Sequence, residues 1–378
     1  MGISMILKAF KFEDISQELK SKKRIVLYGA GRMIQEMEIE LPFLFDEKQS
    51  LSVIDGDCRK WNSYISIFNR TVSIENPNRI LPKLDAGDAI ILTVENFSAM
   101  LETIKECCGK TRIAVYLFAI SRKLERDRKK IYVDKESHID IGDIEMIPRK
   151  IHYFWVGKNP IPNHLMENVK RWRLLCPDYE IVLWNEENLN LEECRYAFQA
   201  YQRGKYGFVP DYFRLKVIYE HGGIYLDTDV ELIKPLDSLL SLGGFAGFED
   251  SDHVAFGLGF GARKGLPVLK EMYEEYLNVN FVDDRGELNL KSSPAYQTEV
   301  LKKYGLVADG HMQQVAGMTI FPMNYLAGQS YRTGLNYIDN HTISVHHYEA
   351  GWLSANDLNI RNIGFDWIKR LEDGEVEY

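Results

Sequence analysis

Short apolar runs alternate with amphipathic stretches through the first third of the chain. Four of these runs, at residues 25–28, 51–54, 89–94 and 113–118, are bounded by Gly, Asp or Asn. Strands that alternate with helical segments are typical of parallel βαβ units. The pattern therefore predicts a Rossmann-like parallel α/β domain over residues 1–120.

A strongly charged run at residues 121–130 ends this alternation, and Pro148 precedes the next apolar run. Such a run indicates a solvated helix or a linker, which we place at residues 121–146. Residues 147–378 again mix apolar strands with helical patterns. They predict a second α/β domain.

The composition agrees with two folded domains, since 45% of the 378 residues are hydrophobic and 27% are charged. The 46 basic and 55 acidic side chains give a net charge of −9, which argues against a nucleic acid partner because phosphate binding needs a basic surface. No apolar stretch approaches the roughly 20 residues of a membrane span, and the first residues do not resemble a leader. The five cysteines show no CxxC spacing, so we expect reduced thiols in a cytoplasmic protein.

A glycine turn at Gly29 and Gly31 follows the first predicted strand of the alternating region. Backbone N–H groups of such a turn can bind a pyrophosphate, and Asp55 ends the next strand, where a ribose-binding acid is expected. Ile34 occupies the position of the third glycine of this motif. A turn that is only structural is the favoured interpretation, and a dinucleotide-dependent oxidoreductase is the alternative.

A helix is predicted at residues 210–221, with Pro210 in its first turn and Gly222 at its end. Asp211 and Arg214 lie three residues apart and therefore on one face of this helix. The helix dipole favours an acid near the helix start and disfavours an arginine there. The pair is either a local salt bridge or a ligand-binding pair, and the position of the arginine favours the second interpretation.

Two acids follow the double glycine at Gly222 and Gly223, after a short apolar strand. Asp227 and Asp229 are two residues apart, so their side chains point to the same side of an extended segment. At about 6–7 Å the two carboxylates repel each other, and a divalent cation would relieve this repulsion. The context indicates a ligand site at the edge of a sheet.

These motifs resemble the signature of the DXD sugar transferases of glycosyltransferase family 32, with the glucosylating domains of clostridial toxins as more distant relatives. The likeness runs from about residue 147 to beyond Trp352. Besides the acids and the double glycine, it includes a strand ending at Trp155, a helix start at Ser293 in place of the family's glycine, and a closing element from His346 to Trp352 with Gly351 in place of the family's serine.

The resemblance implies a role for each matched residue. Asp229 would bind Mn²⁺ or Mg²⁺ directly, Asp227 would contact the donor and reach the metal through water, and His347 would be the further metal ligand. The catalytic residues would be Asp211, Arg214, Asp227 and Asp229. The donor would contact His152, Trp155 (which stacks on uracil), Val156, Asp211, Arg214, Tyr225, Asp227 and Trp352. The glycine-rich residues 256–260 would form the acceptor side.

The resemblance also implies a GT-A nucleotide-diphospho-sugar transferase fold for residues 147–378. The enzyme would be metal-dependent and retaining, and it would move a sugar from a nucleoside diphosphate, UDP by analogy, to a saccharide or lipid-linked glycan acceptor. The process would be synthesis of capsule or another surface polysaccharide in the cytoplasm. Peripheral contact with the inner face of the plasma membrane, aided by residues 122–130, is part of this expectation.

Three other functions are compatible with the residues. One is an NAD(P)-dependent oxidoreductase that uses the turn at Gly29 and Gly31, and another is a non-catalytic protein that binds sugar nucleotides. The third is a metal-dependent phosphohydrolase. The sequence does not predict the donor sugar, the linkage, the role of the N-terminal domain or the oligomeric state.

Overall fold

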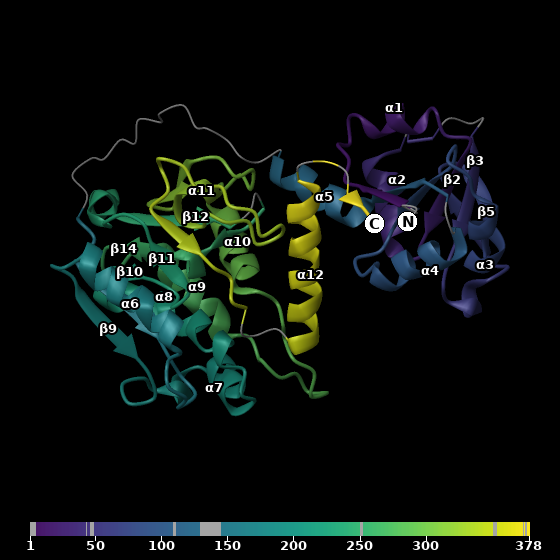
Figure 1. The fold of residues 1–378 in the computed structure, drawn as a ribbon. Coiled ribbons are helices and arrows are strands. Elements are labelled where there is room, and N and C mark those ends of the chain that lie inside the picture. Colours follow the sequence, from purple (N-terminus) through teal and green to yellow (C-terminus); the bar gives the residue numbers. More distant parts are fainter. Residues whose placement is uncertain are drawn as a thin grey trace. The chain divides into compact units, whose positions relative to one another are not determined.

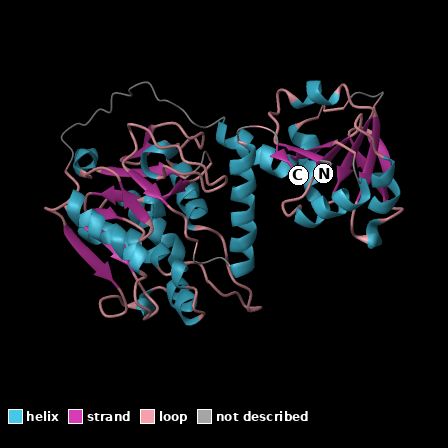
Figure 2. Ribbon diagram, in the orientation of Figure 1, coloured by secondary structure: helices cyan, strands magenta, loops and turns pink. Residues whose placement is uncertain are grey.

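The structure is a computed structural model that describes residues 5–42, 44–45, 49–108, 111–128, 145–249, 252–350, 354–372, 374 and 376–378. The chain divides into two compact units, each with its own sheet (Figures 1 and 2). The first unit is Met1–Arg128 with Asn359–Tyr378, and the second is Lys129–Leu358. The mixed α/β class predicted for the chain is confirmed.

The first unit contains the elements of the alternating region. They are β1 (Met5–Lys8), α1 (Ile15–Leu19), β2 (Arg24–Tyr28), α2 (Arg32–Glu40), β3 (Ser50–Ile54), β4 (Tyr64–Ile67), β5 (Arg70–Glu75), α3 (Pro77–Ile80), β6 (Ala89–Leu92), α4 (Ser98–Cys108), β7 (Ile113–Leu117), α5 (Phe118–Arg128) and β18 (Val376–Glu377). The sheet order is β18-β1-β7-β6-β2-β3-β5-β4. In this order, each strand from β1 to β5 is parallel to its neighbour, which gives the pairs β1-β7, β7-β6, β6-β2, β2-β3 and β3-β5. The edge strands β18 and β4 pair antiparallel with β1 and β5.

The four predicted strands of this unit correspond to β2, β3, β6 and β7. They are inner strands of the sheet, and the near-continuous burial of β2, β6 and β7 explains why their apolar runs are easily recognised, whereas β3 is buried only at its end. The predicted linker is partly helical, because α5 extends to Arg128, and residues 129–144 lie outside the described residues.

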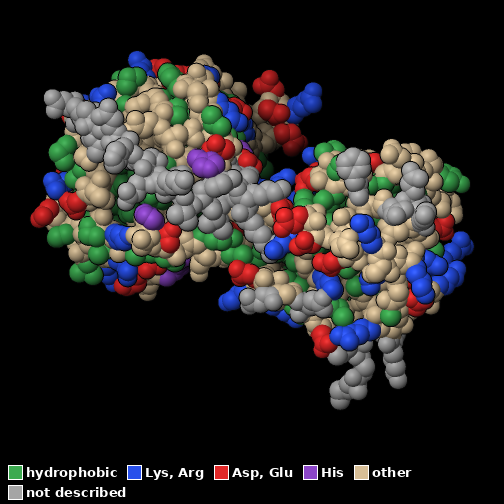
Figure 3. All heavy atoms as spheres, turned by 90° about the horizontal axis from the view of Figure 1, so that it is seen from above, with side chains coloured by type: hydrophobic (Ala, Val, Ile, Leu, Met, Phe, Trp, Pro, Cys, Tyr) green, Lys and Arg blue, Asp and Glu red, His purple; other side chains and the backbone are tan. Residues whose placement is uncertain are grey.

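Three basic side chains of α5 are paired with acids of the first unit. Arg122 contacts Glu36 and lies 3.6 Å from Glu95, while Lys123 lies 2.8 Å from Glu95. Arg126 lies 3.4 Å from Glu40. These pairs leave less positive charge for contact with a membrane surface, and basic and acidic side chains are interspersed on the face drawn in Figure 3.

The C-terminal segment returns to the first unit, whereas the sequence analysis assigned it to the second domain. The long helix α12 (Ala355–Leu371) begins in the second unit and ends in the first. Val376 and Leu7 are paired residues of β18 and β1, and the Trp367 ring lies 6.0 Å from Phe97. A two-residue strand that pairs with the other end of the chain has no local sequence signal.

The second unit contains the elements that carry the candidate site. They are β8 (Lys150–Phe154), α6 (Asn163–Leu175), β9 (Glu180–Trp184), α7 (Arg195–Gln202), α8 (Pro210–His221), β10 (Gly223–Tyr225), β11 (Val230–Leu232), β12 (Gly244–Phe248), β13 (Val254–Ala255), β14 (Phe260–Ala262), α9 (Pro267–Leu277), α10 (Ser293–Lys303), β15 (Gln313–Val315), β16 (Met318–Phe321), α11 (Met323–Leu326) and β17 (Ser344–His346). The main sheet has the order β15-β16-β12-β14-β10-β8-β9, with β13 paired to β12, and β11 pairs with β17.

The helix α8 has the predicted bounds, because Pro210 opens it and Gly222 closes it with φ +66°. Gly223 then begins β10 with φ +111°, and a Cβ there would lie 2.9 Å from the His152 ring and from the Lys150 carbonyl. Only glycine lets β10 approach β8 this closely in that conformation. Because β8 and β10 are parallel neighbours, Trp155 and Asp227 emerge at the same edge of the sheet.

Candidate active site

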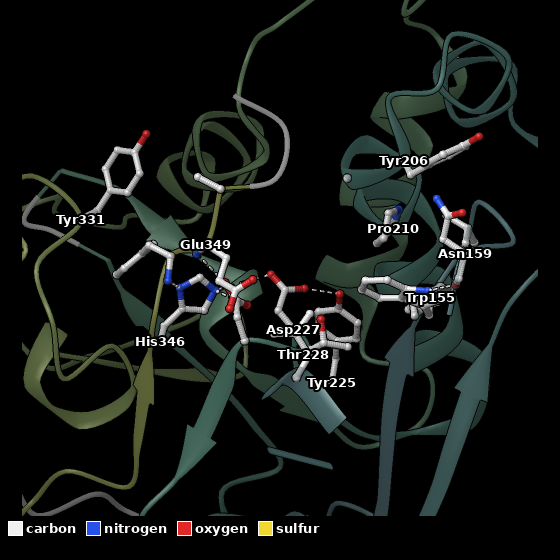
Figure 4. A pocket seen from close by; sticks show the side chains of 17 residues that line it. Trp155, Asn159, Tyr206, Pro210, Tyr225, Asp227, Thr228, Tyr331, His346 and Glu349 are labelled. Carbon is white, nitrogen blue, oxygen red and sulfur yellow. Dashed lines mark hydrogen bonds and ion pairs between the residues drawn. The ribbon is translucent and has the colours of Figure 1, made fainter. Parts of the chain in front are cut away.

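Two adjoining cavities open at this edge of the second unit. The first, which we call the Trp155 cavity, has a volume of about 360 Å³. The second, the Arg214 cavity, has a volume of about 280 Å³. Both are lined by Gly207, Asp227, Tyr331, His346 and Tyr348, so the two cavities share these residues. Figure 4 shows the lining of the Trp155 cavity.

Asp227, Asp229 and His346 form a cluster where the cavities meet. One ligand atom from each lies within 4.8 Å of the other two. The Nε2 atom of His346 is 3.3 Å from Oδ1 of Asp229 and 3.7 Å from Oδ2 of Asp227. The backbone N–H of Glu349 donates to Oδ2 of Asp229 at 3.0 Å, which orients that carboxylate.

The charges of this cluster stabilise each other. Burial acts to raise the pKa of Asp227, but the His346 ring and the Arg214 guanidinium outweigh it, so the pKa lies below its ordinary value. Burial acts to lower the pKa of His346, and the neighbouring Asp229 and Asp227 carboxylates outweigh this effect and raise it. Asp227 is therefore an anion at neutral pH that attracts a positive charge.

The donor atoms of the cluster fit a divalent cation. Two carboxylates and an imidazole suit Mn²⁺, and the buried Nε2 of His346 has no hydrogen-bond partner among the described groups. The Nδ1 atom of His346 accepts the backbone N–H of Tyr348 at 3.2 Å. Ligation through Nε2 would put the ring proton on Nδ1 and deprive that N–H of its acceptor, so the two acids are the principal ligands on offer.

The third member of the cluster is His346 and not the predicted His347. Val230 and His346 are paired residues of β11 and β17, so the His346 side chain faces the acids. His347 is exposed, and its Nε2 lies 3.0 Å from Oε2 of Glu231. Successive residues of a strand point to opposite faces, so only one of two adjacent histidines faces the acids. The family resemblance matches both histidines by position and therefore does not decide which one faces inward.

The predicted pair of Asp211 and Arg214 lies in the wall of the Arg214 cavity and is buried there. The Nη2 atom of Arg214 contacts the Asp211 carboxylate and donates to the Ser293 hydroxyl at 2.6 Å, and Nη1 is 3.7 Å from Asp227. Burial raises the pKa of Asp211 to about 6, although Arg214 acts to lower it. The Tyr225 hydroxyl donates to Asp227. One network therefore joins the arginine, Asp227 and the start of α10.

Gly257, in the turn between β13 and β14, lets this network close. A Cβ at Gly257 would lie 2.6 Å from Oδ2 of Asp227 and 3.4 Å from Nη1 of Arg214. The turn itself is held by α10, since Oε1 of Gln297 accepts the Phe256 N–H at 3.1 Å. Gly257 and Leu258 line the Arg214 cavity, and the acceptor side predicted for residues 256–260 stays a prediction.

Among the other residues predicted to contact the donor, three line the Trp155 cavity and His152 does not. Trp155, Val156 and Tyr225 line the Trp155 cavity. His152 lines neither cavity: it is buried, its Nε2 donates to the Gly222 carbonyl at 3.0 Å, and its Nδ1 accepts the Trp184 N–H. Its place is therefore structural, beneath the double glycine. Trp352 lies outside the described residues.

The glycine turn of the first unit is satisfied by its own side chains. Oδ2 of Asp55 accepts the Ala30 N–H at 2.7 Å and pairs with Lys60 at 2.9 Å, and Oδ1 accepts the Asp57 N–H. The close approach of Val94, 2.7 Å from a Cβ at Gly29, explains the first glycine of the turn. The carboxylate predicted for a ribose thus binds the turn itself.

Comparison with known proteins identifies the central region. Residues 162–244 match the family described as "Glycosyltransferase sugar-binding region containing DXD motif". This region includes α8, the double glycine and both acids of the cluster. The region is similar to the sugar-binding region of DXD glycosyltransferases, and a transferase is the enzyme class that the similarity supports.

Curated relatives share only part of the chain. Inositol phosphoceramide mannosyltransferase 1 of Schizosaccharomyces pombe is 34% identical over 113 residues, which are 28% of this chain and 34% of that protein. Mannosyl phosphorylinositol ceramide synthase SUR1 of Saccharomyces cerevisiae is 30% identical over 105 residues, 27% of each chain. The chain thus spans about a third or less of the length of these relatives. A solved structure, PaToxG glycosyltransferase, covers 43% of this chain and 71% of its own at 19% identity, with a TM-score of 0.36.

Proposed function

We propose that the chain is a metal-dependent, retaining glycosyltransferase of family 32 type with a GT-A fold. It would move a hexose from a nucleoside diphosphate, UDP in our proposal, to a saccharide or lipid-linked glycan. The observation that carries this proposal is the cluster of Asp227, Asp229 and His346 between two cavities. A diphosphate bound there would have its nucleoside on one side and its sugar on the other.

Each cavity carries groups that suit one half of such a donor. The Trp155 cavity offers aromatic rings, which stack on nucleobases. The Arg214 cavity offers the carboxylates of Asp211 and Asp227, which accept hydrogen bonds from sugar hydroxyls. Mn²⁺ or Mg²⁺ would be held by Asp227 and Asp229 and would neutralise the negative charge of the leaving diphosphate.

The residues of the chain would prepare the transfer step in three ways. Arg214 lies 3.7 Å from Asp227 and keeps this carboxylate ionised and fixed. The Tyr225 hydroxyl holds the same carboxylate from the other side. The Glu349 N–H holds the Asp229 carboxylate, which lies beside Asp227 and His346 in the Trp155 cavity. The site is thereby ordered before the donor arrives, which favours transition-state stabilisation over reorganisation.

We further propose that the enzyme works in the cytoplasm, at the inner face of the plasma membrane, in the synthesis of capsule or another surface polysaccharide. The support is the resemblance to family 32. None of the described helices has both the length and the apolar character needed to cross a membrane.

The test is a transfer assay with a panel of donors. The full chain with Mn²⁺ is incubated with UDP-glucose, UDP-galactose, UDP-N-acetylglucosamine and GDP-mannose, and release of the nucleoside diphosphate is measured with and without simple saccharide acceptors. GDP-mannose belongs in the panel because two of the similar proteins are named mannosyltransferases. Acceptor-stimulated release from one donor supports the proposal. Release that no acceptor changes supports a phosphohydrolase, and no release from any donor contradicts the proposal.

A further inference from the structure

Two aromatic rings line the Trp155 cavity from different segments of the second unit. Trp155 follows β8, and Tyr206 lies in the short turn Tyr206–Phe208 that precedes α8. Figure 4 shows the two rings on the same side of the cavity, with Pro210 and Asn159 between them in this view. Tyr206 lines the cavity and is 36% exposed, so part of this residue is accessible to solvent.

Gly157 connects the positions of these two rings. Its φ is +103°, and a Cβ at this residue would lie 2.5 Å from Cε2 of Tyr206. The Tyr206 ring therefore lies directly against the backbone of the loop that carries Trp155. A movement of Gly157 would change the distance between the two rings, because one ring is attached to the loop and the other rests on it.

Glu186 holds Gly157 in place. Its Oε1 atom accepts the backbone N–H of Gly157 at 2.7 Å and the Tyr201 hydroxyl at 3.0 Å. The Tyr201 ring in turn lies 5.4 Å from the Tyr206 ring. Glu186 reaches this point because it follows β9, the parallel neighbour of β8, so the two loops leave the sheet at the same edge. The half-buried carboxylate does not line the cavity itself.

We propose that Glu186 is a positioning residue for the nucleobase of the donor. Through Gly157 and Tyr201 it fixes the loop that carries Trp155 and the ring of Tyr206, which together form one side of the cavity where a flat heterocycle would stack. This inference rests on the proposed function, since it needs a nucleotide donor in the Trp155 cavity. In this proposal Glu186 acts through the hydrogen-bond acceptor at Oε1 and not through the charge of its side chain.

The first experiment compares Glu186→Ala with Glu186→Gln in the full chain. Binding of UDP in the presence of MnCl₂ is measured by calorimetry, and KM and kcat are measured with the donor that the panel identifies. Stacking on one ring contributes about 5- to 160-fold to nucleobase affinity, so displacing the rings should weaken UDP binding about tenfold. Glu186→Ala should therefore raise KM about tenfold with little change in kcat. Glu186→Gln keeps an acceptor oxygen and should remain within about twofold of wild type.

Two variants test the part played by the Tyr206 ring without changing Glu186. Tyr206→Ala removes one of the two rings, and Gly157→Ala displaces the same ring and strains the loop, since its Cβ would lie 2.5 Å from Cε2 of Tyr206 at a φ of +103°. Both should weaken UDP binding as Glu186→Ala does. The matched controls are Glu193→Ala, which removes a carboxylate paired with Lys216, and Tyr304→Ala, which removes an exposed ring, since neither residue lines a cavity.

The outcomes distinguish this inference from the proposed function. Thermal melting identifies a variant that fails to fold. In that case Tyr201→Phe is used instead, because it removes one hydrogen bond to Glu186 without changing a charge. It should weaken UDP binding about two- to fivefold. If wild type binds UDP and Glu186→Ala binds it equally well, the inference is wrong and the proposed function stands. If Glu186→Gln is as weak as Glu186→Ala, the charge acts directly and the positioning role is wrong. If wild type binds no nucleotide, both proposals fail.

Discussion

The chain contains two glycine turns followed by acids at the ends of parallel strands, and they differ in where the acids point. In the first unit, Asp55 accepts the N–H of Ala30 and pairs with Lys60. In the second unit, Asp227 and Asp229 lie beside the Nε2 atom of His346, which has no hydrogen-bond partner in the part of the chain that the structure describes.

This difference separates a structural acid from a functional one. A carboxylate whose oxygens are bound to its own turn and to a lysine has little left to offer a ligand. Two carboxylates held together by a surrounding network keep an unfavourable concentration of negative charge, which a cation relieves. The same local pattern therefore predicts a site only when the carboxylates face each other in a cavity and are not bound to their own turn.

The largest difference in transfer rate between the two turns is expected when one acid is removed from each. Asp229→Ala should lower the transfer rate by on the order of 10³-fold, because the leaving diphosphate loses the ion that neutralises it. Asp55→Asn should leave the rate unchanged. Release of nucleoside diphosphate is measured for both, with circular dichroism to verify folding. Equal rates for Asp229→Ala and wild type would show that the acid pair has no catalytic part.

A smaller effect is expected from adding one methyl group to a glycine of each unit. Gly257→Ala would place a Cβ 2.6 Å from Oδ2 of Asp227, whereas a Cβ at Gly31 meets nothing within 4 Å. Displacing a catalytic carboxylate by this amount should lower kcat/KM about 10²-fold. Gly31→Ala should leave steady-state kinetics unchanged. A Gly257→Ala enzyme with wild-type kinetics would mean that the position of Asp227 is unimportant.

The two turns should also respond differently to acid. Burial lowers the pKa of His152 to about 4 from its ordinary 6.5, so the native state favours the neutral ring. The stability from this ring is present above pH 6.5 and is lost as the pH falls toward 4, by about 2 kcal/mol at pH 5. Burial acts to raise the pKa of Asp55, but bonds from Lys60, Asp57 and Ala30 lower it below 3.8, so that turn stays stable until more acidic pH.

Hydrogen exchange at pH 7 and pH 5, corrected for intrinsic rates, measures this contrast on peptides from each turn. Protection should fall near Gly223 and persist near Ala30. In a His152→Gln variant the fall near Gly223 should be smaller. Equal losses at both turns would contradict the assignment of His152 as a buried neutral ring.

The least severe test compares the two adjacent histidines. His346→Ala should weaken Mn²⁺ binding about tenfold, the usual cost of losing a group close to a metal. His347→Ala should change it by less than about twofold, because that ring contacts Glu231 instead. Titration of UDP binding against Mn²⁺ gives both values. A larger loss for His347→Ala would favour the histidine that the resemblance suggested.

Local patterns predicted the parts of the fold that depend on local physics. The central strands of the first unit are recognisable because they are buried on both faces, and α8 because Pro210 and Gly222 mark its ends. The short strand β18 could not be predicted, since its pairing with β1 joins residues from opposite ends of the chain.

The candidate site was predictable to the extent that its residues belong to one motif. Asp211, Arg214, Asp227 and Asp229 lie in one stretch, and the structure brings them together. His346 could not be chosen over His347, because the facing side of a strand depends on its register with β11. No sequence motif points to Glu186, since its hydrogen bond is to the backbone of Gly157, in the neighbouring loop that follows β8.

The central claim is that the acid pair of the second unit binds a cation together with a diphosphate. The most direct measurement is the electron paramagnetic resonance signal of free Mn²⁺ as the chain and UDP are added. Wild type should remove the free signal when UDP is present, and Asp227→Asn/Asp229→Asn should leave it. An equal loss of the signal in the double variant, or no loss in wild type, would contradict the account.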